Sequence, residues 1–296
     1  MKRKCLAVGI ILLFIGTTII PLSGQDIEKS FTSTSRGNWL YVGGSGPGNY
    51  TRIQDAINNA SNGDTVFVYD DSSPYYEKVK INKAIRLVGE NQQTTVIDGR
   101  DFNIPISTTV SLTADDVTFT GFTVRNGGFI IGIGLNVNST HSTIIGNTFK
   151  GNISHTPIIF DIILANSNNN IIKENTVSLG AVGIYVYASN DTTITGNNIT
   201  KNYGYGIELY NSRRNIISMN NIMENGEHDA FFYRDLGIFP LSNHWNANYW
   251  GKSYFLLKRI PGQMILLEND NFTLTLPLVN FDWLPAYKPY DIPGMR

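Results

Sequence analysis

The chain has 296 residues, 42% of them apolar, which is enough for a hydrophobic core. Its formal net charge is −1, and removal of Lys2, Arg3 and Lys4 leaves 20 basic residues against 24 acidic ones. Because contact with phosphates requires a basic surface, this balance argues against nucleic acid as a partner. The composition therefore predicts a folded protein with no nucleic-acid partner.

Residues 1–24 have the pattern of an export signal. MKRKCLAVGIILLFIGTTIIPLSG starts with basic residues, continues with an apolar run over 6–20 and ends in small residues. The run has about 15 residues, and crossing a bilayer takes roughly 20, so we expect a cleaved signal rather than an uncleaved membrane anchor. A membrane contact is expected only through an uncleaved signal. The mature protein is then secreted or held at the cell surface.

The next segments predict a linker, a helix and then strands. Residues 25–45 begin as a polar, Ser/Thr-rich stretch without periodicity, which is typical of a linker. Apolar residues at helical spacing over 53–60 predict an N-terminal cap helix within 46–64. Short strands separated by Gly, Asn, Asp and Ser are expected over 65–235.

The predicted strands repeat. STIIGNTF, NIIKENTV, TTITGNNI and NIISMNNI share an apolar anchor, an asparagine three residues later and an apolar residue five residues later, and VTFTGFTV is a degenerate earlier copy. The anchors, spaced 22 to 28 residues apart, are Phe119, Ile144, Ile172, Ile194 and Ile217. The asparagines are Asn147, Asn175, Asn197 and Asn220. A serine five residues before an anchor recurs as Ser139, Ser167, Ser189 and Ser212.

This repeat length is typical of proteins that stack one supersecondary unit on the next. The helical segments and regular leucines of leucine-rich repeats are missing, whereas short strands between turn residues favour a parallel β-helix of about seven coils. Because coils stack at about 4.8 Å, the anchors are expected to form an interior column. The asparagines are expected to form a hydrogen-bonded ladder at a turn, rather than a catalytic group.

Two stretches carry a resemblance to known proteins. YTRIQDAINNASNGDTVFVYD followed by YYEKVKINKAIRLVGENQQTTVIDG resembles the opening of pectin-lyase-like right-handed parallel β-helix proteins. The later coils resemble the NosD-type and carbohydrate-binding, sugar-hydrolysis repeat families, and NHWNANYWG with NFDWLPAYKPYDIPG resembles the end of exported archaeal β-helix proteins. The resemblance implies an all-β, single right-handed parallel β-helix. It does not decide activity, because such proteins include lyases, hydrolases, binding proteins and members of unknown role.

The segment 236–296 is rich in aromatic residues and prolines. An open end of a β-helix exposes unpaired backbone and apolar core, so some segment must cover it. We interpret Trp245, Tyr249, Trp250 and Trp283 as an aromatic C-terminal cap, with a platform for stacking sugar rings as the alternative.

Titratable residues lie three positions before four of the five anchors. They are Asp116, His141, Asp191 and Arg214, and the uncharged Asn169 occupies the fifth position. Asp116 and Asp191 would lie about 14 Å apart over three coils, beyond the 5 to 9.5 Å of a glycosidase pair, and Asp161 is likewise too far from Glu208. We expect surface pairs instead, with Asp191 next to Arg214 and Asp116 next to His141.

No catalytic or metal-binding set emerges from the sequence. The resemblance implies clustered acidic residues for a lyase, or paired aspartates with a Gly-His-Gly segment for a hydrolase, and neither pattern is present. Copper requires clustered His, Cys or Met ligands. The candidates are dispersed along the chain: His141, His155, His228, His244, Met219 and Met223. We therefore predict no catalytic residues, no metal ligands and no cofactor.

A candidate ligand-binding face comes from GIYVY and GIELY. Apolar residues alternate there with Tyr185, Tyr187, Glu208 and Tyr210, which predicts these four side chains on the outside of the sheet. Stacking would place Tyr187 beside Tyr210 and Tyr185 beside Glu208. Sugar rings dock on such aromatic faces and their hydroxyl groups on such polar neighbours, although tyrosines also simply cover sheets.

We therefore expect an exported, non-catalytic surface protein that binds a polysaccharide or another envelope component through this face. A polysaccharide lyase or glycoside hydrolase is one alternative, and a structural or adhesive spacer is the other.

Overall fold

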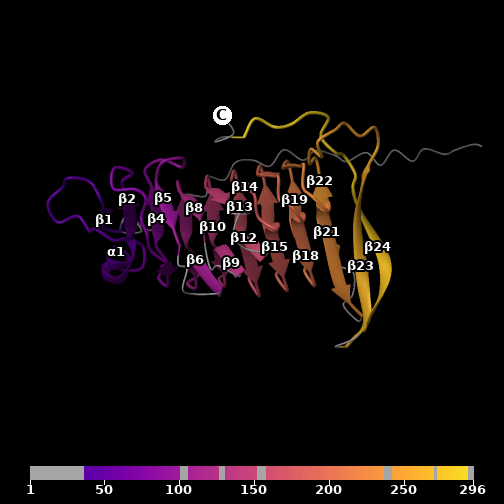
Figure 1. Ribbon diagram of the computed structural model, residues 1–296, viewed down its shortest axis with the longest axis horizontal. Coiled ribbons are helices and arrows are strands. Elements are labelled where there is room, and N and C mark those ends of the chain that lie inside the picture. The colour runs from indigo at the N-terminus through magenta and orange to yellow at the C-terminus, as the bar shows by residue number, and fades with distance from the viewer. Residues whose placement is uncertain are drawn as a thin grey trace, which may run out of the picture. The chain divides into compact units, whose positions relative to one another are not determined.

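The computed structural model describes residues 37–100, 106–126, 131–151, 158–236, 242–269 and 272–292. The predicted export signal and His155 lie outside these residues. The described chain forms a right-handed parallel β-helix, in which each full coil adds one strand to each of three columns (Figure 1). The predicted fold class is confirmed.

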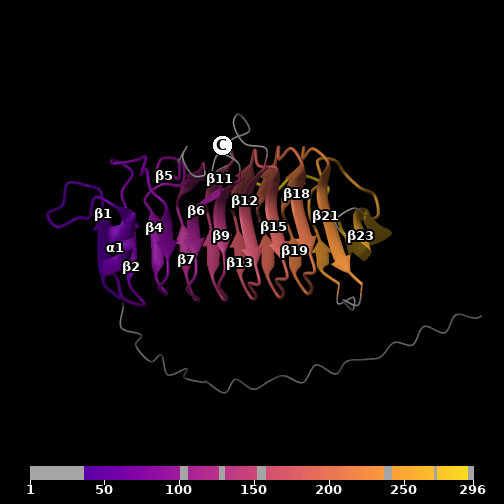
Figure 2. The same ribbon diagram turned by 60° about the horizontal axis from the view of Figure 1, so that its bottom comes forward.

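Strands in a column pair in parallel with the strand one coil earlier and one coil later. The first column contains β1 (Trp39–Val42), β2 (Thr65–Val68), β4 (Arg86–Gly89), β7 (Thr118–Thr120), β10 (Thr143–Ile145), β13 (Ile171–Lys173), β16 (Thr193–Thr195), β19 (Ile216–Ser218) and β22 (His244–Asn246). The second contains β3 (Val79–Ile81), β6 (Ile106–Leu112), β9 (Ile131–Val137), β12 (Ile158–Ala165), β15 (Val182–Tyr187), β18 (Tyr205–Tyr210) and β21 (His228–Asp235). The third contains β5 (Val96–Asp98), β8 (Thr123–Arg125), β11 (Thr148–Lys150), β14 (Thr176–Ser178), β17 (Asn198–Thr200) and β20 (Asn221–Met223). Figure 2 shows the second column from β6 to β21 side by side.

The anchor column predicted from the repeat is confirmed. Ile144 pairs with Phe119 on one side and Ile172 on the other, and all three side chains are buried. The column continues to Leu87 before the recognised repeats and to Trp245 after them. Since stacked apolar side chains leave water together, this column and its neighbours form one continuous core.

The asparagine ladder is also confirmed. The side-chain amide of Asn175 donates to Asn197 Oδ1 at 3.0 Å, and that of Asn197 donates to Asn220 Oδ1 at 2.9 Å. The same amides donate to backbone carbonyls, including Ile172 O at 2.9 Å. The ladder therefore satisfies buried backbone at the turn between the first and third columns, as buried polar groups require.

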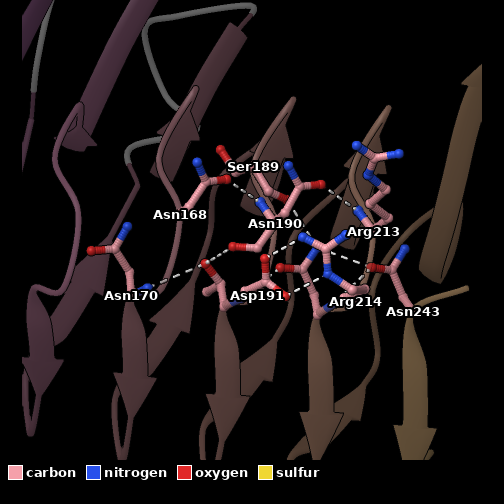
Figure 3. A network of polar contacts seen from close by, with 10 residues as sticks. Asn168, Asn170, Ser189, Asn190, Asp191, Arg213, Arg214 and Asn243 are labelled. Atoms are coloured by element: carbon pink, nitrogen blue, oxygen red, sulfur yellow. Dashed lines mark hydrogen bonds and ion pairs between the residues drawn. The ribbon is translucent and has the colours of Figure 1, made fainter. Parts of the chain in front are cut away.

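The titratable residues lie at the turn between the second and first columns, each with a left-handed backbone, for example φ 56° at Asp191. The predicted pair of Asp191 and Arg214 is present, since Arg214 Nη2 lies 2.5 Å from Asp191 Oδ2. Figure 3 shows the two side chains pointing toward each other. One position differs from expectation: between the first two of these turns, Asp115 rather than Asp116 accepts a bond, from the Thr140 backbone N–H at 2.6 Å.

The N-terminal end of the β-helix is covered by α1 (Ile53–Asn59), within the range predicted for a helix. Its residues Ile53, Ala56 and Ile57 are buried, and the Glu77 carboxylate accepts from the Ile53 backbone N–H at 2.8 Å. The predicted linker 25–45 is corrected over its second part, since residues 39–42 form β1 and pair with β2; residues 25–36 lie outside the described residues. The sequence pattern did not reveal β1, because its four residues alternate only briefly between exposed and buried and follow directly on a polar stretch.

At the other end, the first column continues beyond the predicted limit of residue 235, because β22 pairs with β19. The chain then forms an antiparallel hairpin of β23 (Lys258–Asn269) and β24 (Phe272–Asp282), and β23 pairs with β21 (Figure 1). The Asp282 carboxylate accepts from Asn248 Nδ2 at 3.0 Å and from Trp250 Nε1 at 3.1 Å. Asp282 thereby ends the asparagine ladder and fixes the hairpin to the last coil.

Candidate functional site

The outward face of the second column brings the four predicted site residues together. Tyr185 pairs in register with Glu208, and Tyr187 pairs with Tyr210. Their apolar neighbours on the same strands, such as Ile184, point inward and are buried. Alternation along β15 and β18 therefore places the predicted side chains where the sequence indicated, while their role in binding stays a prediction.

These side chains belong to a larger set of rings, the aromatic face. Its members are Phe160, Tyr185, Tyr187, Tyr210, Phe231 and Tyr233. The ring centroid of Tyr187 lies 5.5 Å from that of Tyr210, which lies 5.9 Å from that of Tyr233. These separations are typical of attractive ring contacts. Tyr187 remains 40% exposed, so the face is accessible to a ligand.

Two glycines hold the strands of this face close together. A Cβ on Gly183 would lie 2.7 Å from the carbonyl oxygen of Gly206, and one on Gly206 would lie 2.5 Å from the Asp229 carbonyl oxygen. Such approaches exclude a side chain. The Gly-Ile-Tyr and Gly-Ile-Glu segments therefore set the coil spacing two residues before Tyr185 and Glu208.

The aromatic face ends in a pocket of about 530 Å³. The solenoid contributes Tyr185, Glu208, Tyr210 and Tyr233, and the hairpin contributes Gln263, Ile265, Glu268, Thr273 and Thr275. The pocket forms because β23 extends the second column, with Tyr233 paired to Gln263, and β24 adds a further strand. Sequence reasoning missed the hairpin residues, although the Phe-Phe-Tyr run at 231–233 was a usable signal for Tyr233.

Glu208 is a half-buried carboxyl group surrounded by rings, paired with Tyr185 on one side and Phe231 on the other. Burial, followed by repulsion from Glu227, raises the pKa of Glu208 to about 7. Burial also raises the pKa of Tyr185 to about 12, with Glu208 as a further cause. Glu208 therefore carries a mixture of neutral and ionised forms near neutral pH.

The orientation of Tyr210 is fixed by a hydrogen bond to Asp235. Its hydroxyl donates to Asp235 Oδ1 at 2.9 Å, and burial together with this carboxylate raises the pKa of Tyr210. Asn211 Nδ2 also donates to Asp235, at 2.7 Å. The ring is thus oriented before any ligand arrives, which lowers the entropy cost of binding.

Asp161, a further carboxyl group of the second column, is not part of the site. It lies in β12 and is 1% exposed, facing the interior. Burial raises the pKa of Asp161 well above its usual range, against the opposing effect of the Gly180 and Gly151 backbone N–H groups. It is thus separated from Glu208 by the sheet itself as well as by β15.

The aromatic residues of the C-terminal segment divide into two groups. Trp245 and Trp250 are each 3% exposed, with ring centroids 6.0 Å apart, and lie in the core. Trp283 is 62% exposed, and its ring centroid lies 5.3 Å from that of Phe281. The first two stabilise the last coil rather than face a ligand.

Residues 57–251 match the protein family described as periplasmic copper-binding protein (NosD). The chain belongs to this family. No curated protein sequence matches this NosD-family chain significantly. No helix among its described residues is long and apolar enough to span a membrane.

Solved structures similar to this NosD-family chain share its fold at low identity. Pectate lyase Pel9A has 14% identity and a TM-score of 0.54, over 75% of this chain and 72% of the lyase. An alginate lyase from Paenibacillus sp. has 13% identity and a TM-score of 0.51, over 72% of this chain and 85% of the lyase. The Dettilon tailspike protein has 12% identity and a TM-score of 0.50, over 80% of this chain and 48% of the tailspike.

The family description implies copper, which proteins hold through clustered imidazole, thiolate or thioether groups. In the part of the chain that the structure describes, no three His, Cys, Asp or Glu side chains lie close enough to hold a metal ion. Met264 Sδ lies 3.8 Å from Arg234 Nη2, a cation that would repel a metal. The described residues therefore do not fit a copper centre.

Proposed function

We propose that the protein is exported and binds a glycan along the aromatic face, with part of the ligand in the hairpin pocket. The observation that carries this proposal is the joining of a partly exposed row of tyrosine rings to a concave pocket with polar walls. Apolar faces of sugar rings pack on tyrosines, and sugar hydroxyl groups bond to carboxyl, amide and hydroxyl groups. Tyr187 and Tyr210 supply the rings, and Glu208, Gln263 and Thr275 supply polar partners.

Export is supported from two directions. The N-terminal sequence has the basic, apolar and small-residue regions of a signal peptide. The matching family is described as periplasmic. A glycan ligand also agrees with the names of two similar structures, a pectate lyase and an alginate lyase.

Glycoside hydrolysis is a second candidate, favoured by the presence of Glu208 and Glu268 on the walls of one pocket. Hydrolysis of a glycosidic bond uses two carboxyl groups, one of which donates a proton to the leaving oxygen. A carboxyl group whose pKa is about 7, such as Glu208, suits that donor.

Affinity electrophoresis of the protein through gels that contain neutral and acidic polysaccharides tests both candidates. We expect retarded migration and unchanged polymer length. Replacing both Tyr187 and Tyr210 by alanine should abolish retardation, whereas Tyr287→Ala, which changes an exposed tyrosine elsewhere, should not. Shortened polymer would favour hydrolysis, and unchanged migration in every gel would rule out glycan binding and leave a structural spacer.

A further inference from the structure

The pocket is acidic on two walls. Glu208 enters from β18, and Glu268 enters from β23 of the hairpin. Among the described residues that line the pocket, every other side chain is uncharged, and none is Lys, Arg or His. Two further carboxyl groups lie close by, since Asp235 bonds to the Tyr210 hydroxyl and Glu227 raises the pKa of Glu208.

This charge distribution discriminates between classes of glycan. A polyuronate carries one carboxylate on each sugar unit, so entry would bring like charges together in a partly desolvated site with no cation to offset them. An uncharged sugar unit carries no such penalty. It meets rings, the Gln263 amide and the Thr273 and Thr275 hydroxyl groups, all of which suit neutral hydroxyl groups.

We propose that the site selects glycans of uncharged sugar units and rejects polyuronates, through repulsion from Glu208 and Glu268. This inference rests on the proposed glycan-binding function and names its ligand class. It separates this chain from the pectate lyase and alginate lyase that share its fold, whose names refer to polyuronates. Rejection by like charge is a recognised route to specificity, because specificity is a difference between two affinities.

The test measures the affinity of the full protein at low ionic strength for a neutral β-glucan, a polygalacturonate and an alginate of matched length. We expect the neutral glucan to bind at least about tenfold more tightly than either polyuronate, because each tenfold step needs only a modest repulsion. Raising the salt to about 1 M should reduce this preference, because salt screens exposed charges.

Charge reversal in the pocket provides the matched comparison. Glu268→Lys is expected to raise the affinity for polygalacturonate, relative to the affinity of the same variant for neutral glucan, at least about tenfold. The control is Glu174→Lys, which makes the same charge change at a turn between the first and third columns. The control should alter neither affinity.

Two results would overturn the inference while leaving glycan binding intact. One is a wild-type protein that binds polyuronates, or oligomers of positively charged glucosamine, in preference to neutral glucan. The other is a Glu268→Lys variant that behaves like the Glu174→Lys control. A protein that binds none of the polymers would instead overturn the proposed function itself, and the inference with it.

Discussion

At the scale of single residues, Glu208 combines burial, aromatic neighbours and a second carboxyl group nearby. A carboxyl group is costly to ionise in such surroundings, and the pKa of Glu208 rises from its ordinary 4.5 to about 7. An apolar residue at this position would carry no desolvation cost of a charged group. A carboxyl group perturbed in this way supports the proposed binding role of Glu208, because perturbed titratable groups gather at functional sites.

Glu208→Gln is expected to flatten the dependence of stability on pH. The raised pKa means that the contribution of Glu208 to the free energy of unfolding is fully present below pH 4.5 and is lost as the pH rises through about 7. After allowance for solvent screening, the variant should gain about 1 to 2 kcal/mol relative to wild type between pH 4 and pH 8.

Urea unfolding of both proteins at each pH measures this difference. Asp161 has the same direction of pKa shift, but it is present in both proteins and cancels. Glu174→Gln serves as a control and should follow wild type at each pH. Parallel stability curves for wild type and Glu208→Gln would contradict the assignment.

At the scale of elements, the turns determine how the strands stack. The turn between the first and third columns is held by the buried asparagine ladder, and the turn between the second and first columns carries exposed side chains such as Asp191 and Arg214. The first kind is stabilising because buried donors and acceptors are costly when unpaired. The exposed Asp191–Arg214 pair contributes little, since water competes for both charges. The turn that carries it is held by its own buried groups, such as Asn215, whose side-chain amide donates to Ser189 O at 3.0 Å.

Asn197→Ala is expected to lower the free energy of unfolding by about 2 to 4 kcal/mol, because it orphans several buried groups at once. The Asn175 backbone N–H loses its side-chain acceptor, the Asn175 side-chain amide keeps only Ile144 O, and the Ile172 carbonyl loses the Asn197 amide. Asp191→Ala, a substitution in the preceding turn, should leave the urea midpoint nearly unchanged. Equal midpoints for the two variants would show that the ladder does not stabilise the fold.

At the scale of the whole molecule, each coil contacts mainly the coils before and after it. Stability in such proteins is close to a sum of coil and interface terms, so the number of coils can change while the fold persists. The constraint is register, because every column must continue through the junction. The repeat spacing of 22 to 28 residues shows that loops absorb changes in length without breaking register.

Deletion of residues 172–193 removes one complete repeat and joins Ile171 to Ile194, both in first-column strands. We expect a folded β-helix by far-UV circular dichroism and a cooperative thermal transition. Ligand binding should weaken, since the deletion removes Tyr185 and Tyr187 and keeps Glu208 and Tyr210. Deletion of residues 172–182 alone joins strands of different columns and should abolish folding. Equal behaviour of the two deletions would refute this description of the fold.

The sequence by itself determined the coils. Ile144, Ile172 and their counterparts repeat because each occupies the same place in a stacked unit, so periodicity predicted a parallel β-helix and its pairing register, and the resemblance to known proteins added its handedness. The same register predicts Tyr187 beside Tyr210, as the structure shows. Local alternation and repetition carry this information, because the partners of each strand are its own neighbouring copies.

Only the tertiary structure decided the pocket and the way the hairpin closes the C-terminal end. The β23 and β24 hairpin has no counterpart in the repeat. The periodicity therefore does not predict that Glu268 lines the same pocket as Glu208, or that Asp282 accepts a hydrogen bond from the last asparagine of the ladder. Likewise, alternation along a strand predicts which side chains face the interior and which face solvent. Asp161 in β12 is buried where alternation predicts an outward side chain. Contacts between non-repeated segments depend on packing across long separations in the chain, which no local pattern specifies.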